Sequence, residues 1–171
     1  MSLQRVLVVG SRHHGKTAYL RALVARARAA DLRVRGFLTE AAPGDTHKRA
    51  LYLREIGGAL PPLFLGATSA GPGLDLRVGS YYLSSATFAR AEAVLSRSLD
   101  ADLICLDEIG PLELRGGGFS AALARLLESY RGILVLTTRP ALATMLLQLL
   151  QRSAAGAPGA GAPAAAGRCP G

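Results

Sequence analysis

Residues 3–20 decide the fold, and they read Leu-Gln-Arg-Val-Leu-Val-Val-Gly-Ser-Arg-His-His-Gly-Lys-Thr-Ala-Tyr-Leu. An apolar run typical of a buried strand ends at Gly10, and an amphipathic stretch typical of a helix begins near Lys16. Between them lies the pattern G-x-x-x-x-G-K-[ST], which binds polyphosphates when a strand precedes it and a helix follows. A glycine-rich turn can point main-chain N–H groups inward, and the helix start adds further donors. The stretch therefore predicts a phosphate-binding loop.

We expect the whole loop to contact a nucleotide. Lys16 would supply a cation to the β/γ oxygens and act as a catalytic residue, and Thr17 would offer a hydroxyl to Mg²⁺. The centre of the loop is His13-His14, whose side chains either face the phosphates or point to solvent. The expected contact residues are Gly10, Ser11, Arg12, His13, His14, Gly15, Lys16, Thr17 and Ala18.

An acidic pair, Asp107 and Glu108, follows the apolar run 102–106. Ligands of open α/β sheets bind at the carboxyl ends of the strands, so we expect these acids to lie near the loop. Asp107 would hold Mg²⁺, and Glu108 would polarise an attacking water as the catalytic base. The competing interpretation is that both acids only begin a solvated loop. Glu113 either makes a structural hydrogen bond or touches the ligand.

The apolar run 132–138 ends in Thr137 and Thr138 and is followed by Arg139. If this strand neighbours the Asp107 strand, these side chains lie beside the γ-phosphate. Arg139 would then be a catalytic arginine supplied in cis. The alternative is that Thr138 caps the helix opened by Pro140 while Arg139 faces water.

Hydrophobic periodicity indicates one α/β domain over residues 1–152. Three strands follow one another at a spacing too short for crossover helices, so this part is expected to be antiparallel. Residues 153–171 are rich in Ala, Gly and Pro and are expected to form a disordered tail. The expected strands are 3–9, 32–39, 49–56, 62–66, 102–107 and 132–138, with a short segment at 78–83. The expected helices are 16–30, 85–98, 119–130 and 140–151.

Composition limits the possible partners. The formal net charge of +8 suits a polyanionic ligand, but the arginines are scattered and aromatics are only 5%, which speaks against dedicated nucleic-acid binding. Cys105 and Cys169 offer neither a disulfide framework nor metal-ligand spacing, so we expect a cytoplasmic protein. No uncharged apolar run reaches the length of a membrane span, so we expect no membrane partner. We also expect a monomer.

Four segments of the chain resemble the THEP1 family of nucleoside-triphosphatases. They are residues 10–17, Arg35-Gly-Phe-Leu-Thr-Glu40, Val78-Gly-Ser-Tyr81 and Asp107-Glu-Ile-Gly-Pro-Leu-Glu-Leu114. The resemblance spans about residues 3–150, and the Asp-Glu-Ile-Gly stretch is its most specific part. It implies an α/β P-loop NTPase fold, a three-layer sandwich whose central sheet is mainly parallel, here with an antiparallel strand extension.

The resemblance also implies Mg²⁺-dependent hydrolysis of a nucleoside triphosphate, such as ATP or GTP, to the diphosphate and phosphate. The implied roles of residues 15–17, Asp107 and Glu108 match those argued above. The chain departs from the family in lacking Pro-Gly at the centre of the loop, in having Ala18 for a second Thr, and in having Pro111 for a Lys. Because these departures lower the expected turnover, a nucleotide-binding switch or adaptor stays open as an alternative. A nucleoside or nucleotide kinase is a second alternative, for which Arg115 and the three glycines after it would form a lid.

Overall fold

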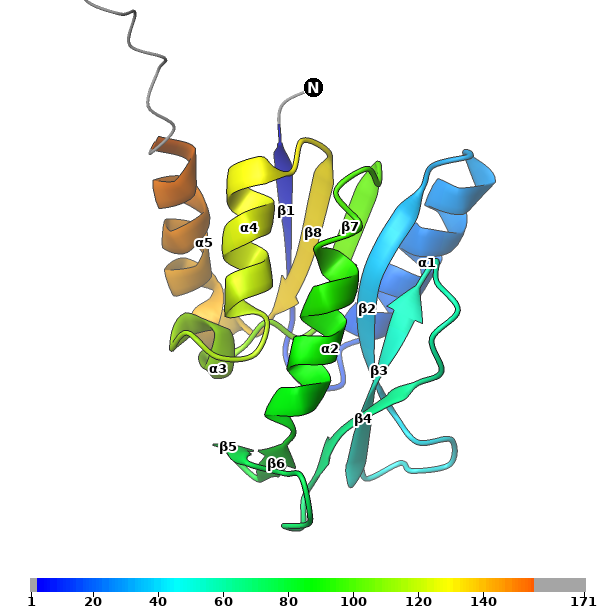
Figure 1. Ribbon diagram of the computed structural model, residues 1–171, viewed down its shortest axis with the longest axis vertical. Coiled ribbons are helices and arrows are strands. Elements are labelled where there is room, and N and C mark those ends of the chain that lie inside the picture. Colours follow the sequence, from blue (N-terminus) through cyan, green and yellow to red (C-terminus); the bar gives the residue numbers. More distant parts are fainter. Residues whose placement is uncertain (1–2, 156–171) are drawn as a thin grey trace, which may run out of the picture.

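Residues 3–155, which the computed structural model describes, form an eight-stranded sheet with helices on both faces (Figure 1). Helix α1 (Lys16–Ala29) covers one face. Helices α2 (Ser85–Leu95), α4 (Ser120–Ser129) and α5 (Pro140–Ala155) cover the other. Each face buries its own apolar cluster, as amphipathic helices on a sheet require.

Four parallel strands carry the site. In order across the sheet they are β1 (Gln4–Val9), β8 (Ile133–Thr138), β7 (Leu103–Leu106) and β2 (Val34–Ala41). Strand β8 therefore lies between the strand before the glycine-rich loop and the strand before the acidic pair. Because parallel strands end at the same edge, the loop, the acids and the end of β8 meet there.

The other half of the sheet is antiparallel, as expected from the short spacing of its strands. It consists of β3 (Ala50–Ile56), β4 (Leu63–Ala67), β6 (Tyr81–Leu83) and β5 (Leu76–Val78). Parallel pairings join β1–β8, β8–β7 and β7–β2, whereas antiparallel pairings join β2–β3, β3–β4, β4–β6 and β6–β5. The sheet is therefore mixed, and the prediction of a mainly parallel sheet was wrong, because the hairpins contribute as many strands as the crossovers.

Several boundaries differ from the sequence-based expectation. The segment 78–83 is a hairpin of β5 and β6, turned at Gly79, whose φ of 59° suits glycine. A short helix, α3 (Pro111–Leu114), was not predicted, although Pro111 at its first position is typical of a helix start. Helix α5 continues to Ala155, and the remainder of the expected tail, residues 156–171, lies outside the described residues.

The close approach of β2 to β7 requires Gly36. Its φ is 128°, and a Cβ at this position would lie 1.9 Å from the carbonyl oxygen of Cys105. Gly36 pairs with Cys105 in the register of the two strands. The glycine thus permits β7 to deliver Asp107 against β2.

Among the described residues, no helix is long and apolar enough to cross a membrane.

Candidate active site

The glycine-rich loop is closed by its own lysine. Lys16 is 6% exposed, and its Nζ donates to the carbonyl oxygens of Gly10 at 2.8 Å and Ser11 at 2.9 Å. Gly15, with a φ of 75°, turns the chain into α1, a conformation that glycine adopts without steric cost. The ammonium group is therefore held at the centre of the loop, at the start of a helix, where an anion is best stabilised.

The remaining loop residues are exposed, and the two histidines behave differently. His14 places its Nδ1 2.9 Å from the carbonyl oxygen of Arg12, within the loop itself. His13 has a φ of 62° and lines a cavity together with Arg12. Ser11 and Ala18 are also exposed on the loop and the first turn of α1. Of the two histidines, only His13 lines the cavity.

A hydrogen bond joins the loop to the acidic pair across 90 residues of sequence. The hydroxyl of Thr17 donates to Asp107 Oδ2 at 2.7 Å. Asp107 is 2% exposed, and burial raises the pKa of its carboxyl, although hydrogen bonds from Thr137 and Thr17 oppose this shift. The main-chain N–H of Thr39 also donates to Oδ2, at 3.3 Å. The expectation that the loop and this acid lie together is thus met in the structure.

Glu108 has a backbone conformation that few residues other than glycine adopt. Its φ is 62°, a left-handed value that costs energy for a residue with a Cβ. Its N–H donates to Thr137 Oγ1 at 2.8 Å, and the next N–H, of Ile109, donates to the carbonyl oxygen of Thr137 at 2.9 Å. Neighbouring strand β8 therefore fixes the turn that aims the Glu108 side chain.

The Glu108 carboxylate lies between two cations. Its Oε1 is 3.9 Å from Lys16 Nζ, and its Oε2 is 3.7 Å from Arg139 Nη2. The Glu108 side chain is 31% exposed and that of Arg139 is 40% exposed, so both can reach a ligand as well as each other. The structure thus brings together Lys16, Thr17, Asp107, Glu108 and Arg139.

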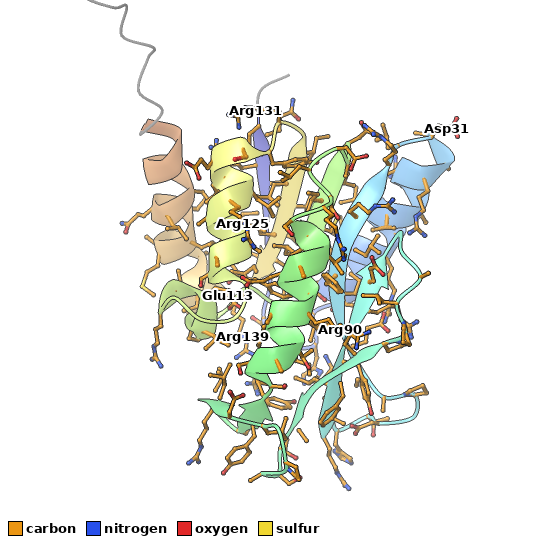
Figure 2. All side chains as sticks on the ribbon, viewed as in Figure 1. Asp31, Arg90, Glu113, Arg125, Arg131 and Arg139 are labelled. Carbon is orange, nitrogen blue, oxygen red and sulfur yellow. The ribbon has the colours of Figure 1, made fainter. Side chains whose placement is uncertain are left out.

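Two predictions left open concern Thr138 and Glu113. The Thr138 hydroxyl donates to the carbonyl oxygen of Ile109 at 2.7 Å, so it fastens the acidic turn. Glu113 accepts from the N–H groups of Gly110 at 2.8 Å and Phe119 at 3.2 Å. Of its two expected roles, it therefore fills that of a structural hydrogen-bond acceptor. Burial raises the pKa of the Glu113 carboxyl. In Figure 2, Glu113 and Arg139 lie near the middle of the view, below Asp31 and Arg131 at the top.

Sequence reasoning missed the contribution of two threonines. Thr137 is fully buried, and its hydroxyl donates to Asp107 Oδ1 at 2.6 Å while accepting from the Glu108 N–H. Thr39 supports the same carboxylate through its main-chain N–H. The available signal was a pair of polar residues, Thr137 and Thr138, at the end of an otherwise apolar strand.

The oxygen atoms at this site suit a magnesium ion. Thr17 offers a hydroxyl and Asp107 a carboxylate, and Mg²⁺ prefers one or two such protein ligands together with phosphate oxygens and waters. Within the part of the chain that the structure describes, no group of three or more His, Cys, Asp or Glu side chains is arranged to hold a metal by itself. The residues present therefore fit a metal shared with a phosphate ligand.

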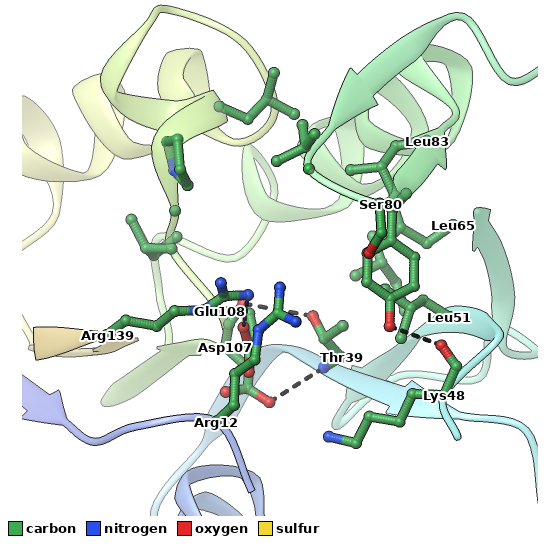
Figure 3. Close-up of a pocket in the computed structure, with 18 of the residues that line it drawn as sticks. Arg12, Thr39, Lys48, Leu51, Leu65, Ser80, Leu83, Asp107, Glu108 and Arg139 are labelled. Carbon is green, nitrogen blue, oxygen red and sulfur yellow. Dashed lines mark hydrogen bonds and ion pairs between the residues drawn. The ribbon is translucent and has the colours of Figure 1, made fainter. Parts of the chain in front are cut away.

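A cavity of about 380 Å³ opens beside the acidic pair (Figure 3). Its walls come from the loop, β2 to β4, the β5–β6 hairpin and the segment after β7. Polar side chains such as Arg12, Asp107 and Glu108 lie on one side, and the leucines of β3, β4 and β6 lie on the other. The cavity volume is within the range of small-molecule sites.

Comparison with known proteins agrees with this geometry. A family described as NTPase matches residues 5–157. The nucleoside-triphosphatase THEP1 of Methanosarcina acetivorans is 26% identical over 132 residues, which is 76% of this chain and 73% of the relative. That of Hyperthermus butylicus is 47% identical over 57 residues, or 31% of this chain and 28% of the relative.

Solved structures show the same fold. The crystal structure of THEP1 from Aquifex aeolicus superposes with a TM-score of 0.67 at 20% identity, covering 87% of this chain and 84% of that one. The solution structure of a human cancer-related nucleoside triphosphatase gives a TM-score of 0.65 at 23% identity, covering 85% and 84%. Since the family match spans most of the sequence, the chain belongs to the NTPase family.

Proposed function

We propose that this chain, a nucleoside-triphosphatase by its family, hydrolyses a nucleoside triphosphate such as ATP or GTP in a magnesium-dependent reaction at the edge where β1, β7 and β8 end. The observation that carries the proposal is the hydrogen bond of 2.7 Å between Thr17 and Asp107. It joins the phosphate loop to the acidic pair, with Glu108 3.9 Å from the loop lysine. Residues 1–152 act as the single catalytic domain.

The loop and its cations would bind the substrate. Lys16 exchanges its bonds to the loop carbonyls for bonds to the β/γ oxygens, and the loop N–H groups surround the phosphates. Thr17 and Asp107 would hold the metal, which would neutralise phosphate charge when bound. Arg139 lies beside Glu108 and stabilises the negative charge that develops on the transferred group.

Glu108 would act on the attacking water. The water oxygen forms a bond to the γ-phosphorus as the bond to the β–γ bridging oxygen breaks, and the electron pair leaves with the nucleoside diphosphate. The proton lost by the water passes to the Glu108 carboxylate. Thr137 is a positioning residue, because it bonds both acids without reaching the substrate.

Phosphate release from ATP and GTP, with and without Mg²⁺, tests the proposal. We expect Glu108→Gln to lower kcat by roughly 10²-fold or more, the usual contribution of a general base, while AMP-PNP still binds. Glu128→Gln, on the exposed side of α4, is the matched control and should retain wild-type turnover. Equal kcat in wild type and Glu108→Gln would refute the role of Glu108, and retained nucleotide binding in Lys16→Ala would refute the site itself.

Hydrolysis is favoured over the other two functions. The curated relatives are all named nucleoside-triphosphatases. Neither a switch or adaptor without turnover nor a nucleoside or nucleotide kinase is favoured by these comparisons.

A further inference from the structure

We propose that the cavity beside the acidic pair binds a second ligand, a small planar organic anion, while the nucleoside triphosphate occupies the phosphate loop. The inference rests on the proposed function, because that function fixes which side of the loop the γ-phosphate occupies. Asp107 and Glu108 mark this side, and both line the cavity. The nucleoside end of the bound triphosphate then points away from the acidic pair, so it does not fill the cavity.

The composition of the cavity wall supports a separate site. Only Arg12 and His13 of the phosphate loop line the cavity, whereas Gly10, Lys16 and Thr17 do not. A triphosphate held by the loop therefore borders the cavity without occupying it. The volume of about 380 Å³ leaves room for one small organic molecule.

One end of the cavity is suited to a flat apolar group. Leu51 and Leu53 of β3, Leu65 of β4 and Leu83 of β6 lie on this side. Figure 3 shows Leu51, Leu65 and Leu83 across the opening from the acidic pair. The walls are tied together, because the Tyr81 hydroxyl donates to the carbonyl oxygen of Lys48 at 2.7 Å. An aromatic ring placed here would bury apolar surface on a site that already exists.

The cavity also carries two cations without acidic partners, Arg12 on the side of the phosphate loop and Lys48 on the side of Leu51. Its carboxylates are already engaged: Asp107 accepts hydrogen bonds from threonines, Glu113 from main-chain N–H groups, and Glu108 pairs with Lys16 and Arg139. Arg12 and Lys48, in contrast, make no ion pair within residues 3–155.

Figure 3 shows Arg12 and Lys48 on opposite sides of the opening, with the Lys48 side chain extending toward the side of Arg12. Charged groups bind an anion most strongly where other charges do not compensate them, so these two side chains are suited to a phosphate, sulfonate or carboxylate. The ligand that suits the leucines and these cations has a planar apolar body and one anionic group.

Isothermal titration of the full chain with 1-naphthyl phosphate, in saturating Mg²⁺ and AMP-PNP, tests the proposal. We expect one site per chain with a Kd below about 1 mM, reasonable for a ligand of this size. Because AMP-PNP occupies the loop, this binding reports the cavity alone. Inorganic phosphate and 1-naphthol, which each have only one of these two features, should bind at least about tenfold more weakly.

A charge-reversal pair locates the site. Lys48→Glu should weaken 1-naphthyl phosphate binding by roughly tenfold or more, because it replaces one of the two cations with an acid. Arg49→Glu makes the same change one residue along, at an exposed position outside the cavity, and should bind as wild type does. Melting temperatures of both variants verify that they fold.

The proposal is overturned if AMP-PNP displaces the probe, because the cavity would then belong to the nucleotide. It is also overturned by the absence of binding, or by equal affinities of Lys48→Glu and Arg49→Glu. These results differ from a failure of the proposed function, which would appear as unchanged turnover in Glu108→Gln or as nucleotide binding in Lys16→Ala. Probe binding without nucleotide remains measurable in either case.

Discussion

Replacing Thr137 by valine tests how strand β8 contributes to catalysis. Valine keeps the shape of the side chain but removes a hydroxyl that donates to Asp107 Oδ1 at 2.6 Å and accepts from the Glu108 N–H at 2.8 Å. Both acids would lose a contact that orients them. The left-handed turn at Glu108, with its φ of 62°, would lose one of the bonds that hold it.

The size of the effect follows from the lost bonds. A hydrogen bond to a charged group contributes about 1.5–3 kcal/mol, and about 1.4 kcal/mol corresponds to a tenfold change in rate. We therefore expect Thr137→Val to lower kcat/KM roughly 10- to 150-fold. The unpaired N–H of Glu108 also costs about 1–3 kcal/mol of stability, so the melting temperature should fall.

The pH dependence separates positioning from a general loss of structure. Burial already raises the pKa of Asp107, and the bond from Thr137 opposes that shift by stabilising the charged form. Removing the bond should raise the pKa further. The acid limb of kcat/KM against pH, to which the ionisation of Asp107 contributes, should then move to higher pH.

The assay is phosphate release between about pH 5 and pH 9 for wild type, Thr137→Val and Thr137→Ser. Serine keeps the hydroxyl and should restore both the activity and the position of the acid limb. A valine variant with kcat/KM within about twofold of wild type and an unmoved acid limb would refute the reasoning.

Three further predictions concern stability and reactivity. Gly36→Ala should destabilise the fold by about 3 kcal/mol, because its Cβ would meet the Cys105 carbonyl. The control is Gly44→Ala, at a φ of 79° with no atom near the added Cβ, which should lower the free energy of unfolding by less. Equal losses of unfolding free energy in the two variants, measured by urea unfolding, would contradict the predicted clash. Glu113→Gln should lower the free energy of unfolding by about 1–3 kcal/mol, because one carboxylate acceptor becomes a donor; an unchanged urea midpoint would contradict this. Cys105, fully buried with a pKa raised to about 12, should resist iodoacetamide at pH 8 until the chain unfolds, as mass spectrometry of labelled peptides would reveal.

Local patterns were enough to place the loop against the acids. The strand before Gly10 and the apolar run before Asp107 each predict a strand of an open α/β sheet, and parallel strands end at one edge. The expectation that the first of these is buried was wrong, because β1 is an edge strand on which Val6 and Val9 are exposed. The rule predicts that Thr17 and Asp107 lie at the same edge, and in the structure a hydrogen bond joins them. Ser84 caps α2, because its side chain accepts from the Thr87 N–H.

What the sequence did not provide was the identity of neighbours across the sheet. The pairing of β8 with β7 was an open condition, so the role of Thr137 could not be derived. Whether the sheet is mainly parallel depends on how many hairpins extend it. Neither the period of the hydrophobic residues nor the spacing of the strands along the sequence determines that number. The cavity likewise combines Lys48, Leu83 and Glu108 from distant parts of the chain, which only the three-dimensional fold brings together.

The charges at the site explain why substrate and metal should act together. Two acids, Asp107 and Glu108, lie among two cations, Lys16 and Arg139, so the resting cluster is balanced. In the proposed reaction a triphosphate would attract the cations away from Glu108, and this would free the carboxylate to accept a proton from water. The same anion would repel Asp107, which is buried and tolerates its charge poorly, unless a divalent cation lies between them. It follows that nucleotide without Mg²⁺ should bind weakly, and that Asp107→Asn should remove most of the gain in affinity that Mg²⁺ provides.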